Sequence, residues 1–532
     1  MPQSPRNNPR ISTIILVTVI LTGFGITLRW FSFSWNTRLY GDVNLFALTA
    51  RQIAQSGQLN YPMKYDYSTH VPYFTLNSPA GQHPPLFPLM AGELARLIGV
   101  RDTFLILKAL TYFWGIILLG LFLYFTLQQS SVSRWVGLSL VSLSPWLVDY
   151  SANGSPYILI ACLLLMAHWL WRTWDETRMK TPLLAGILCA ISWLTHGILI
   201  ALSIAFLIRI IFINHQKPSL VVKQALSFIL AFAIPILPWL VWNQKTFLTP
   251  FYSASSTYLM EQLGLSRIQI QGQGISWVIQ PLPISQLFNN YAMLVSKAAY
   301  AGLKESVAVL TPWGGILVLA GIYTIVYGTI HKNKSLNKNG STSILKKGIY
   351  LLCSPLGLYI LTVLFWATYK LRFLIPILPF LYWGIGVGTE WLIQQANWRK
   401  WVGWGLLAGT LVSMSSIYLQ PKPNLYYGFE TTQNTLMYDQ MQPMAVQLGQ
   451  LPKGVVLGVS HSLDGGIETI YWSEQHFVAG RGFDPDIWIK LARDFKVRYI
   501  WSDRDQEQTI MSVFPDARMI LANNQYLVYQ LP

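Results

Sequence analysis

The chain has 532 residues, of which 52% are apolar and 11% are charged. An ordinary soluble domain carries about 25% charged residues, so this composition excludes a soluble globular protein and indicates an integral membrane protein among lipids. The formal net charge of +16 does not indicate nucleic-acid binding, because the Lys and Arg residues are scattered between apolar runs. The three cysteines, Cys162, Cys189 and Cys353, lie within apolar segments and predict neither a disulfide framework nor a metal site.

Long apolar runs with short connections predict about eleven transmembrane helices. Arg6 and Arg10 precede the first run, which has no small-residue cleavage site near its end, so we interpret it as an uncleaved span. The runs cover residues 11–30, 104–127, 135–150, 156–171, 183–196, 198–214, 225–243, 310–330, 349–367, 373–392 and 402–419.

The even-numbered connections between these runs are short and basic, for example RTWDETRMK and HKNKSLNKNGSTSILKKG. The positive-inside rule places them and the N-terminus in the cytoplasm. The opposite side then holds outer loops at 31–103 and 244–309 and the chain after Gln420. We therefore expect a transmembrane domain over 1–420 and a small extracytoplasmic α/β domain over 421–532. Its predicted strands are GVVLGVS, VRYIWSD and QYLVYQL, and its predicted helix is PDIWIKLARDF.

The first outer loop contains the stretch LYGDVNLFALTARQIAQSG. From Val43 onward its apolar residues form one helical stripe, which predicts an amphipathic helix on the membrane surface. Asp42 lies at or just before the first turn, where free N–H groups and the helix dipole stabilise a carboxylate. Two interpretations stay open at this point, a helix cap and a functional acid.

Further along the same loop, GQHPPLFPLMAGELARLIG predicts a second amphipathic helix that begins after two prolines. His83 directly precedes those prolines. A single histidine in a loop is most often merely solvated or hydrogen-bonded, so the pattern alone does not assign it a function.

Together, an acid at the membrane exit, an amphipathic helix and a basic residue before Pro-Pro resemble the first loop of lipid-linked-sugar glycosyltransferases of the GT-C fold. The resemblance is to the protein O-mannosyltransferase and aminoarabinose (4-amino-4-deoxy-L-arabinose) transferase branch. Four later segments are similar to patterns of that group in the same order, namely SPWLVDYSANGSPYILIACLLL, WLTHGILIAL, ILPWLVWNQKTFLTPFYS and YKLRFLIPILPFLYW. The chain departs from the family pattern at Val43, in place of a second acid, and at Trp242, in place of an arginine. The second-loop acid is absent unless Asp149 fills its place.

The resemblance implies a glycosyltransferase that moves a hexose or pentose from a polyprenyl-phosphate-linked donor to a protein, glycolipid or polysaccharide acceptor. It implies inversion at the anomeric carbon, on the extracytoplasmic side of the plasma (inner) membrane. Asp42 would then be the general base, and Asp149 an acceptor-side or secondary acid. Four residues are candidates to bind the donor phosphate, His83, Arg372, Lys370 and His196. Arg372 is also typical of an interfacial anchor, and His196 of a helix end.

No cofactor and no metal are expected. The Asp-x-Asp triplets DPD (484–486) and DRD (503–505) are interpreted as turn and cap residues, because the tail is too small for a nucleotide-sugar transferase fold.

Two other functions stay open, a multi-span transporter and a non-catalytic lipid-binding or assembly protein of the cell envelope. A transporter is expected to carry ionisable residues in the middle of its spans. Here Arg29, Lys108, Arg209 and Glu390 all lie near span ends, which argues against transport. The missing partner acid at Val43 keeps the non-catalytic alternative open.

Overall fold

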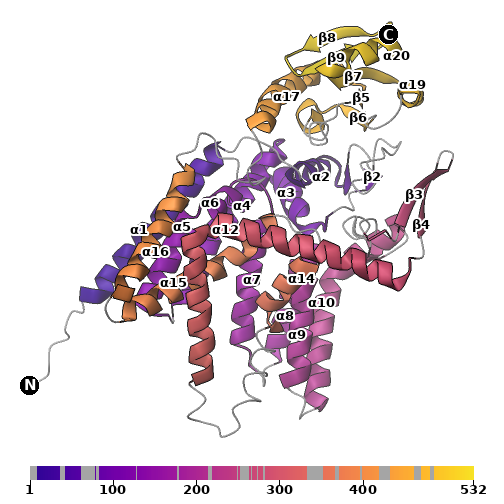
Figure 1. The fold of residues 1–532 in the computed structure, drawn as a ribbon. Coiled ribbons are helices and arrows are strands. Elements are labelled where there is room, and N and C mark those ends of the chain that lie inside the picture. Colours follow the sequence, from indigo (N-terminus) through magenta and orange to yellow (C-terminus); the bar gives the residue numbers. More distant parts are fainter. Residues whose placement is uncertain are drawn as a thin grey trace, which may run out of the picture.

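The protein is a bundle of apolar helices with a small mixed sheet at one end (Figure 1). The computed structural model describes residues 9–35, 42–61, 78–79, 83–127, 129–175, 179–213, 218–247, 250–251, 263–264, 266–271, 274–279, 282–331, 352–365, 371–395, 398–418, 432–459, 469–479 and 485–532.

The bundle consists of the helices that the apolar runs predict. They are α1 (Pro9–Trp35), α4 (Thr103–Thr126), α5 (Ser131–Leu143), α6 (Pro145–Tyr150), α7 (Tyr157–Arg172), α8 (Lys180–Thr195), α9 (Ile200–Ile213), α10 (Pro218–Phe247), α12 (Ile284–His331), α14 (Pro355–Phe365), α15 (Leu378–Gln394) and α16 (Trp398–Tyr418). The short 3-10 helix η1 (Gly197–Leu199) joins α8 to α9.

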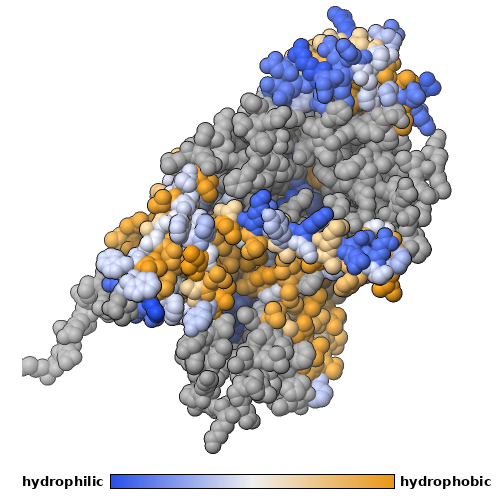
Figure 2. Space-filling view, viewed as in Figure 1, coloured by the Kyte–Doolittle hydropathy of each residue, from blue (hydrophilic) through white to orange (hydrophobic). Residues whose placement is uncertain are grey.

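Apolar side chains cover the outside of this bundle. In the described residues, four helices are long and apolar enough to cross a membrane, within Ile15–Ser34, Thr103–Thr126, Pro218–Thr246 and Ile284–Thr324, and several shorter apolar helices accompany them. Figure 2 shows hydrophobic residues gathered over the bundle and hydrophilic residues over the C-terminal end. A soluble protein does not expose Leu, Ile and Phe side chains to water in such numbers, because their contact with water is unfavourable. The chain is therefore a multi-pass membrane protein.

The run expected as one span at 135–150 is broken at Ser144, where α5 ends and α6 begins. Pro145 has no N–H, so the carbonyl of Val141 loses its helical partner. Arg29 of α1 is fully buried beside this break and donates hydrogen bonds to the Val141 carbonyl (3.1 Å) and the Ser142 carbonyl (3.4 Å). It also donates to Ser151 Oγ at 3.1 Å. A buried guanidinium therefore compensates the interrupted backbone.

The second outer loop contains more helix than expected. It holds the hairpin β3 (Ser266–Gln271) and β4 (Gly274–Ile279), and α12 (Ile284–His331) then consists of two helices separated by a kink at Thr311, next to the predicted start of the span at 310. The two halves of α12 meet at Thr311, which has a left-handed φ of 64° directly before Pro312. Proline disfavours the helical conformation of the residue before it. The helix is therefore interrupted at Thr311, and a second helix begins directly after it.

The first outer loop forms helices α2 (Asp42–Ser56) and α3 (Leu86–Ile98), with the strands β1 (Asn60–Tyr61) and β2 (Ser78–Pro79) between them. All side chains of α2 from Val43 to Ala50 are buried, including the polar Asn44 and Thr49, so protein covers more of this helix than its apolar stripe alone predicts. α3 covers α2 so closely that a Cβ on Gly92 would lie 2.7 Å from the Ala50 carbonyl oxygen.

The C-terminal unit starts with α17 (Thr432–Gln450) and contains a five-stranded sheet of order β6-β5-β7-β9-β8. The strands are β5 (Val455–Gly458), β6 (His476–Ala479), β7 (Val497–Asp503), β8 (Arg518–Ala522) and β9 (Tyr526–Gln530), with α19 (Pro485–Asp494) and α20 (Glu507–Val513) between them. β5 pairs in parallel with β6 and β7, and β9 pairs antiparallel with β7 and β8. The three predicted strands and the predicted helix are present, and β6 and β8 are additional.

Candidate functional site

Two predicted site residues from distant parts of the chain form an ion pair at the start of α2. Arg372 Nη1 lies 2.6 Å from Asp42 Oδ2, and His83 Nε2 lies 3.8 Å from Asp42 Oδ1. The first distance is that of a charge-assisted hydrogen bond, whereas the second is too long for one. The three side chains are 13–15% exposed, so the cluster is reachable from outside.

Local structure brings each of these residues into place. Asp42 is the first residue of α2, where unpaired N–H groups and the helix dipole favour its negative charge. His83 stands two residues before Pro85, the N-cap of α3, and its ring lies 4.9 Å from the ring of Phe46. Phe46 is one turn after Asp42 on α2, so the tight packing of α2 on α3 places His83 beside the carboxylate.

Arg372 lies in the short 3-10 helix η2 (Leu371–Phe373), which precedes η3 (Ile375–Ile377) and α15. Pro376 and Pro379 follow within these turns, and prolines at helix starts limit the conformations of the segment. The guanidinium lies 5.9 Å from the ring of Tyr157 and 5.8 Å from that of Phe373, so aromatic rings flank it.

His196 belongs to the same cluster. Its ring lies 5.9 Å from the rings of both Tyr157 and Phe373, and its electrostatic neighbours are His83, Arg372 and Asp42. Its Nδ1 accepts a hydrogen bond from the Ile198 N–H at 3.3 Å. An accepting Nδ1 carries no proton, so His196 offers a neutral Nε2–H donor in this arrangement.

Tyr157 and Phe373 complete the site, and sequence reasoning missed both. They lie 6.0 Å from each other and contact both Arg372 and His196. Aromatic residues make up 14% of the chain and occur in every predicted span, so their types carried no signal. The position of Tyr157, directly after Pro156 at the start of α7, was the one local indication available.

The structure places the remaining predicted residues as follows. Asp149 lies on the short helix α6, where Tyr418 of α16 is its electrostatic neighbour. Lys370 lies outside the described residues. Of the two Asp-x-Asp triplets, Asp486 occupies the first turn of α19, and Asp503 is the N-cap residue of η4 (Arg504–Gln506).

Solved structures with a similar fold are known, although no protein-family model and no curated sequence matches the chain. ArnT from Cupriavidus metallidurans, bound to undecaprenyl phosphate, matches with a TM-score of 0.59 and 12% identity, over 96% of this chain and 97% of that one. The archaeal oligosaccharyltransferase AglB from Archaeoglobus fulgidus, in complex with an inhibitory peptide and a dolichol-phosphate, matches with a TM-score of 0.53 and 13% identity, over 95% and 71%. A zinc and sulfate complex of the Archaeoglobus fulgidus oligosaccharyltransferase gives 0.55 and 14% over 96% and 72%.

Both neighbours have the GT-C fold, and the chain shares this fold over almost its whole length. The prediction of a GT-C-type helical membrane protein with a small C-terminal sheet is therefore confirmed.

Proposed function

We propose that the protein is a glycosyltransferase that uses a polyprenyl-phosphate-linked sugar as donor. The observation that carries this proposal is the cluster of Asp42, Arg372 and His83, one acid with two basic groups at the first turn of a helix in a GT-C fold. Such a cluster combines a proton acceptor with groups that bind a phosphate, which are the two components that transfer from a sugar phosphate requires.

In the proposed reaction, Asp42 accepts the proton of the acceptor hydroxyl while the acceptor oxygen attacks the anomeric carbon. The bond between that carbon and the phosphate oxygen breaks, and the polyprenyl phosphate leaves with the electron pair. Attack from the face opposite the leaving group inverts the anomeric carbon. No covalent sugar–enzyme intermediate is needed, so one carboxylate suffices, and Val43 in place of a second acid is compatible with turnover.

The leaving phosphate needs positive charge in a water-poor site. Arg372 supplies a fixed guanidinium that can bind two phosphate oxygens at once. In the structure Nη1 of this guanidinium lies 2.6 Å from Asp42 Oδ2. We propose that the donor phosphate competes with Asp42 for Arg372, so that donor binding releases the carboxylate to act as a base. His83 and the Nε2–H of His196 contribute further donors, and Lys370 stays a prediction.

The donor class has support from the structural neighbours. One of them was solved with undecaprenyl phosphate and another with a dolichol-phosphate and an inhibitory peptide. We carry over only the chemistry that these ligands share, a phosphate on a polyprenyl chain. The acceptor is a protein, a glycolipid or a polysaccharide precursor, and Asp149 stays a candidate for its positioning.

We also propose that the cluster faces the extracytoplasmic side of the inner membrane. α2, α3 and the C-terminal unit lie at one end of the bundle (Figure 1). The connection at 332–351 follows the other end of α12. It is the longest of the basic connections. With basic connections in the cytoplasm, the cluster and the C-terminal unit lie outside.

A transporter is the alternative, and the partners of the charged side chains in the bundle argue against it. Arg29 donates to backbone carbonyls at the break between α5 and α6. Lys108 donates to the Phe33 carbonyl at 2.6 Å and lies over the Phe33 ring. These cations stabilise the bundle, so their presence in apolar helices does not require an ion path.

The test uses purified protein in nanodiscs with a panel of synthetic polyprenyl-phosphate sugars. We expect one donor to lose its sugar and to release polyprenyl phosphate when an extract fraction that contains the acceptor is added. A transporter would be established instead by two results together. The lipid-linked sugars would stay intact with every fraction, and the substrate would cross the membrane of liposomes that contain the protein. Donor binding without either activity would establish the non-catalytic lipid-binding protein.

A further inference from the structure

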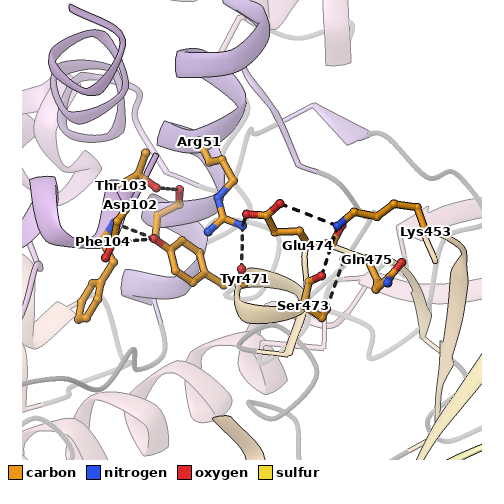
Figure 3. Close-up of polar contacts among 10 residues, drawn as sticks. Arg51, Asp102, Thr103, Phe104, Lys453, Tyr471, Ser473, Glu474 and Gln475 are labelled. Carbon is orange, nitrogen blue, oxygen red and sulfur yellow. Dashed lines mark hydrogen bonds and ion pairs between the residues drawn. The ribbon is translucent and has the colours of Figure 1, made fainter. Parts of the chain in front are cut away.

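The C-terminal unit contacts the membrane region through Tyr471 (Figure 3). This residue is buried, with 1% of its surface exposed. Tyr471 lies in the short helical segment 469–473 between β5 and β6. The guanidinium of Arg51, on α2, lies 3.9 Å above the Tyr471 ring, and its Nη1 donates to the Tyr471 carbonyl oxygen at 2.7 Å. The same Nη1 lies 3.9 Å from the carboxylate of Glu474. One arginine of α2 therefore contacts both a face and a backbone group of this tyrosine.

The hydroxyl of Tyr471 makes a second attachment, to the first turn of α4. It donates to Asp102 Oδ1 at 2.7 Å and accepts from the Phe104 N–H at 2.9 Å. Asp102 is also the N-cap of α4, where Oδ1 accepts from the Leu105 N–H at 3.1 Å. Burial and the neighbouring Asp102 outweigh Arg51 and raise the pKa of Tyr471 to about 12, so the hydroxyl keeps the proton that it donates.

The first attachment holds the helix that begins with Asp42 directly, and the second reaches it through the start of α4. Arg51 lies about two and a half turns after Asp42, or about 13 Å along the axis of α2. Between them, the Ala47 carbonyl accepts a hydrogen bond from Thr103 Oγ1 at 2.8 Å, and Thr103 adjoins Asp102. A helix held at one point can still roll or slide, whereas contacts at Ala47 and at Arg51 together fix its rotation and its axial position.

We infer that Tyr471 and Arg51 are positioning residues, through which the C-terminal unit holds α2 so that Asp42 stays in register with Arg372. The inference rests on the proposed function, because it gives a role to the position of Asp42. A displacement of about 1 Å between reacting groups can lower a rate about a hundredfold, so even a small movement of α2 is costly.

The experiment compares three changes at the contact with a matched control. Tyr471→Phe removes only the hydroxyl, and Arg51→Met removes the guanidinium but keeps an unbranched apolar side chain. Arg51→Lys keeps a donor for the Tyr471 carbonyl. Tyr529→Phe is the control, because Tyr529 is a buried tyrosine of the same sheet whose hydroxyl has no hydrogen-bond partner among the described residues.

The full-length variants are measured in nanodiscs by steady-state transfer and by hydrogen exchange of the α2 backbone. We expect Tyr471→Phe and Arg51→Met each to lower kcat by about tenfold to a hundredfold, while the KM for the donor changes less than about twofold. We expect the double variant to be slower than either single variant, since the hydroxyl of Tyr471 and the guanidinium of Arg51 make separate contacts. Exchange of α2 amides rises in both variants, and Arg51→Lys recovers part of each effect.

The inference is overturned if Tyr471→Phe and Arg51→Met keep the wild-type kcat and the wild-type exchange of α2, as the control Tyr529→Phe is expected to do. An equal loss in Tyr529→Phe also overturns it, since it would indicate a general loss of stability. Should Tyr471→Phe fail to fold, the Arg51 variants leave the C-terminal unit intact and decide the matter. If the wild-type protein transfers no sugar, the proposed function fails, and exchange of α2 alone then tests the contact, with unchanged exchange overturning it.

Discussion

Asp42 Oδ2 and Arg372 Nη1 lie 2.6 Å apart. Asp42 is the first residue of α2 in the first outer loop, whereas Arg372 lies far along the chain, just before α15. Two partly buried opposite charges at this distance stabilise each other, and each limits what the other can bind. A phosphate that enters the site must share Arg372 with Asp42 or replace it. The pair therefore links donor binding to the state of the proposed base, and it can be tested from either side.

Asp42→Asn is expected to lower transfer about a hundredfold or more, because the amide cannot accept the proton of the acceptor. An asparagine can still stabilise the start of α2, so the fold is retained, and donor binding is retained or tightened because a neutral amide competes less for Arg372. Single-turnover transfer and thermal unfolding of the purified variant check this, with Asp486→Asn as an exposed control in the first turn of α19. Near wild-type turnover would reduce Asp42 to a structural residue and make Asp149 the next acid to replace.

Arg372→Ala is expected to weaken binding of the polyprenyl-phosphate donor by about 1.5–3 kcal/mol, the range for a hydrogen bond to a charged group. Arg372→Lys restores the charge but not the planar pair of donors, so it recovers only part of the affinity. Titration with the donor in nanodiscs measures both variants. Equal affinity for Arg372→Ala and the wild type would remove this residue from the phosphate site.

His83→Gln is expected to weaken donor binding less than Arg372→Ala does. The imidazole lies 3.8 Å from Asp42 and makes no hydrogen bond to it, so its removal leaves the ion pair with Arg372 in place. The same donor titration measures the effect, with the exposed His476 of β6 changed to Gln as control. An effect larger than that of Arg372→Ala would make His83 the main phosphate ligand.

Gly92→Ala is expected to lower the free energy of unfolding by about 1–3 kcal/mol and to reduce transfer as well. The added Cβ would lie 2.7 Å from both the Ala50 carbonyl oxygen and Ile53 Cβ, so α3 would push α2 away. Gly120→Ala is the control, because among the described residues no atom beyond its own helix backbone lies within 4 Å of an added Cβ, and alanine favours the helix. Thermal unfolding and transfer are measured on both, and equal behaviour would show that α2 and α3 tolerate separation.

Reporter fusions after about residue 340 are expected to report the cytoplasm, and fusions at the C-terminus the outside. The expectation follows from the basic connections and from the position of the C-terminal unit at the same end of the bundle as α2 (Figure 1). Fusions that placed the C-terminus inside would reverse the orientation and exclude an extracytoplasmic Asp42.

The helices and much of the C-terminal sheet could be predicted from the sequence, because their signals are local. Each apolar run forms helix in the structure, and the pattern from Val43 corresponds to α2. Hydrophobic periodicity predicts such elements because it depends only on the residues of one element. The break at Pro145 was equally local in cause. It was missed because apolar residues continue on both sides of Pro145, and the guanidinium that compensates the break comes from another helix.

The tertiary structure alone decided which residues meet. Asp42 and Arg372 were named separately from the sequence, but their ion pair depends on how the fold brings η2 to the start of α2, for which one sequence holds no signal. The burial of α2 was also decided by the tertiary structure. An amphipathic stripe indicates that one face of a helix avoids water, but it does not indicate whether lipid or protein covers that face. Tyr471 shows the same limit, because a tyrosine in a tail has no pattern that points to Arg51 and Asp102. Contacts between distant segments are set by the packing of whole elements, and that packing is decided only when all of them bury their surfaces together.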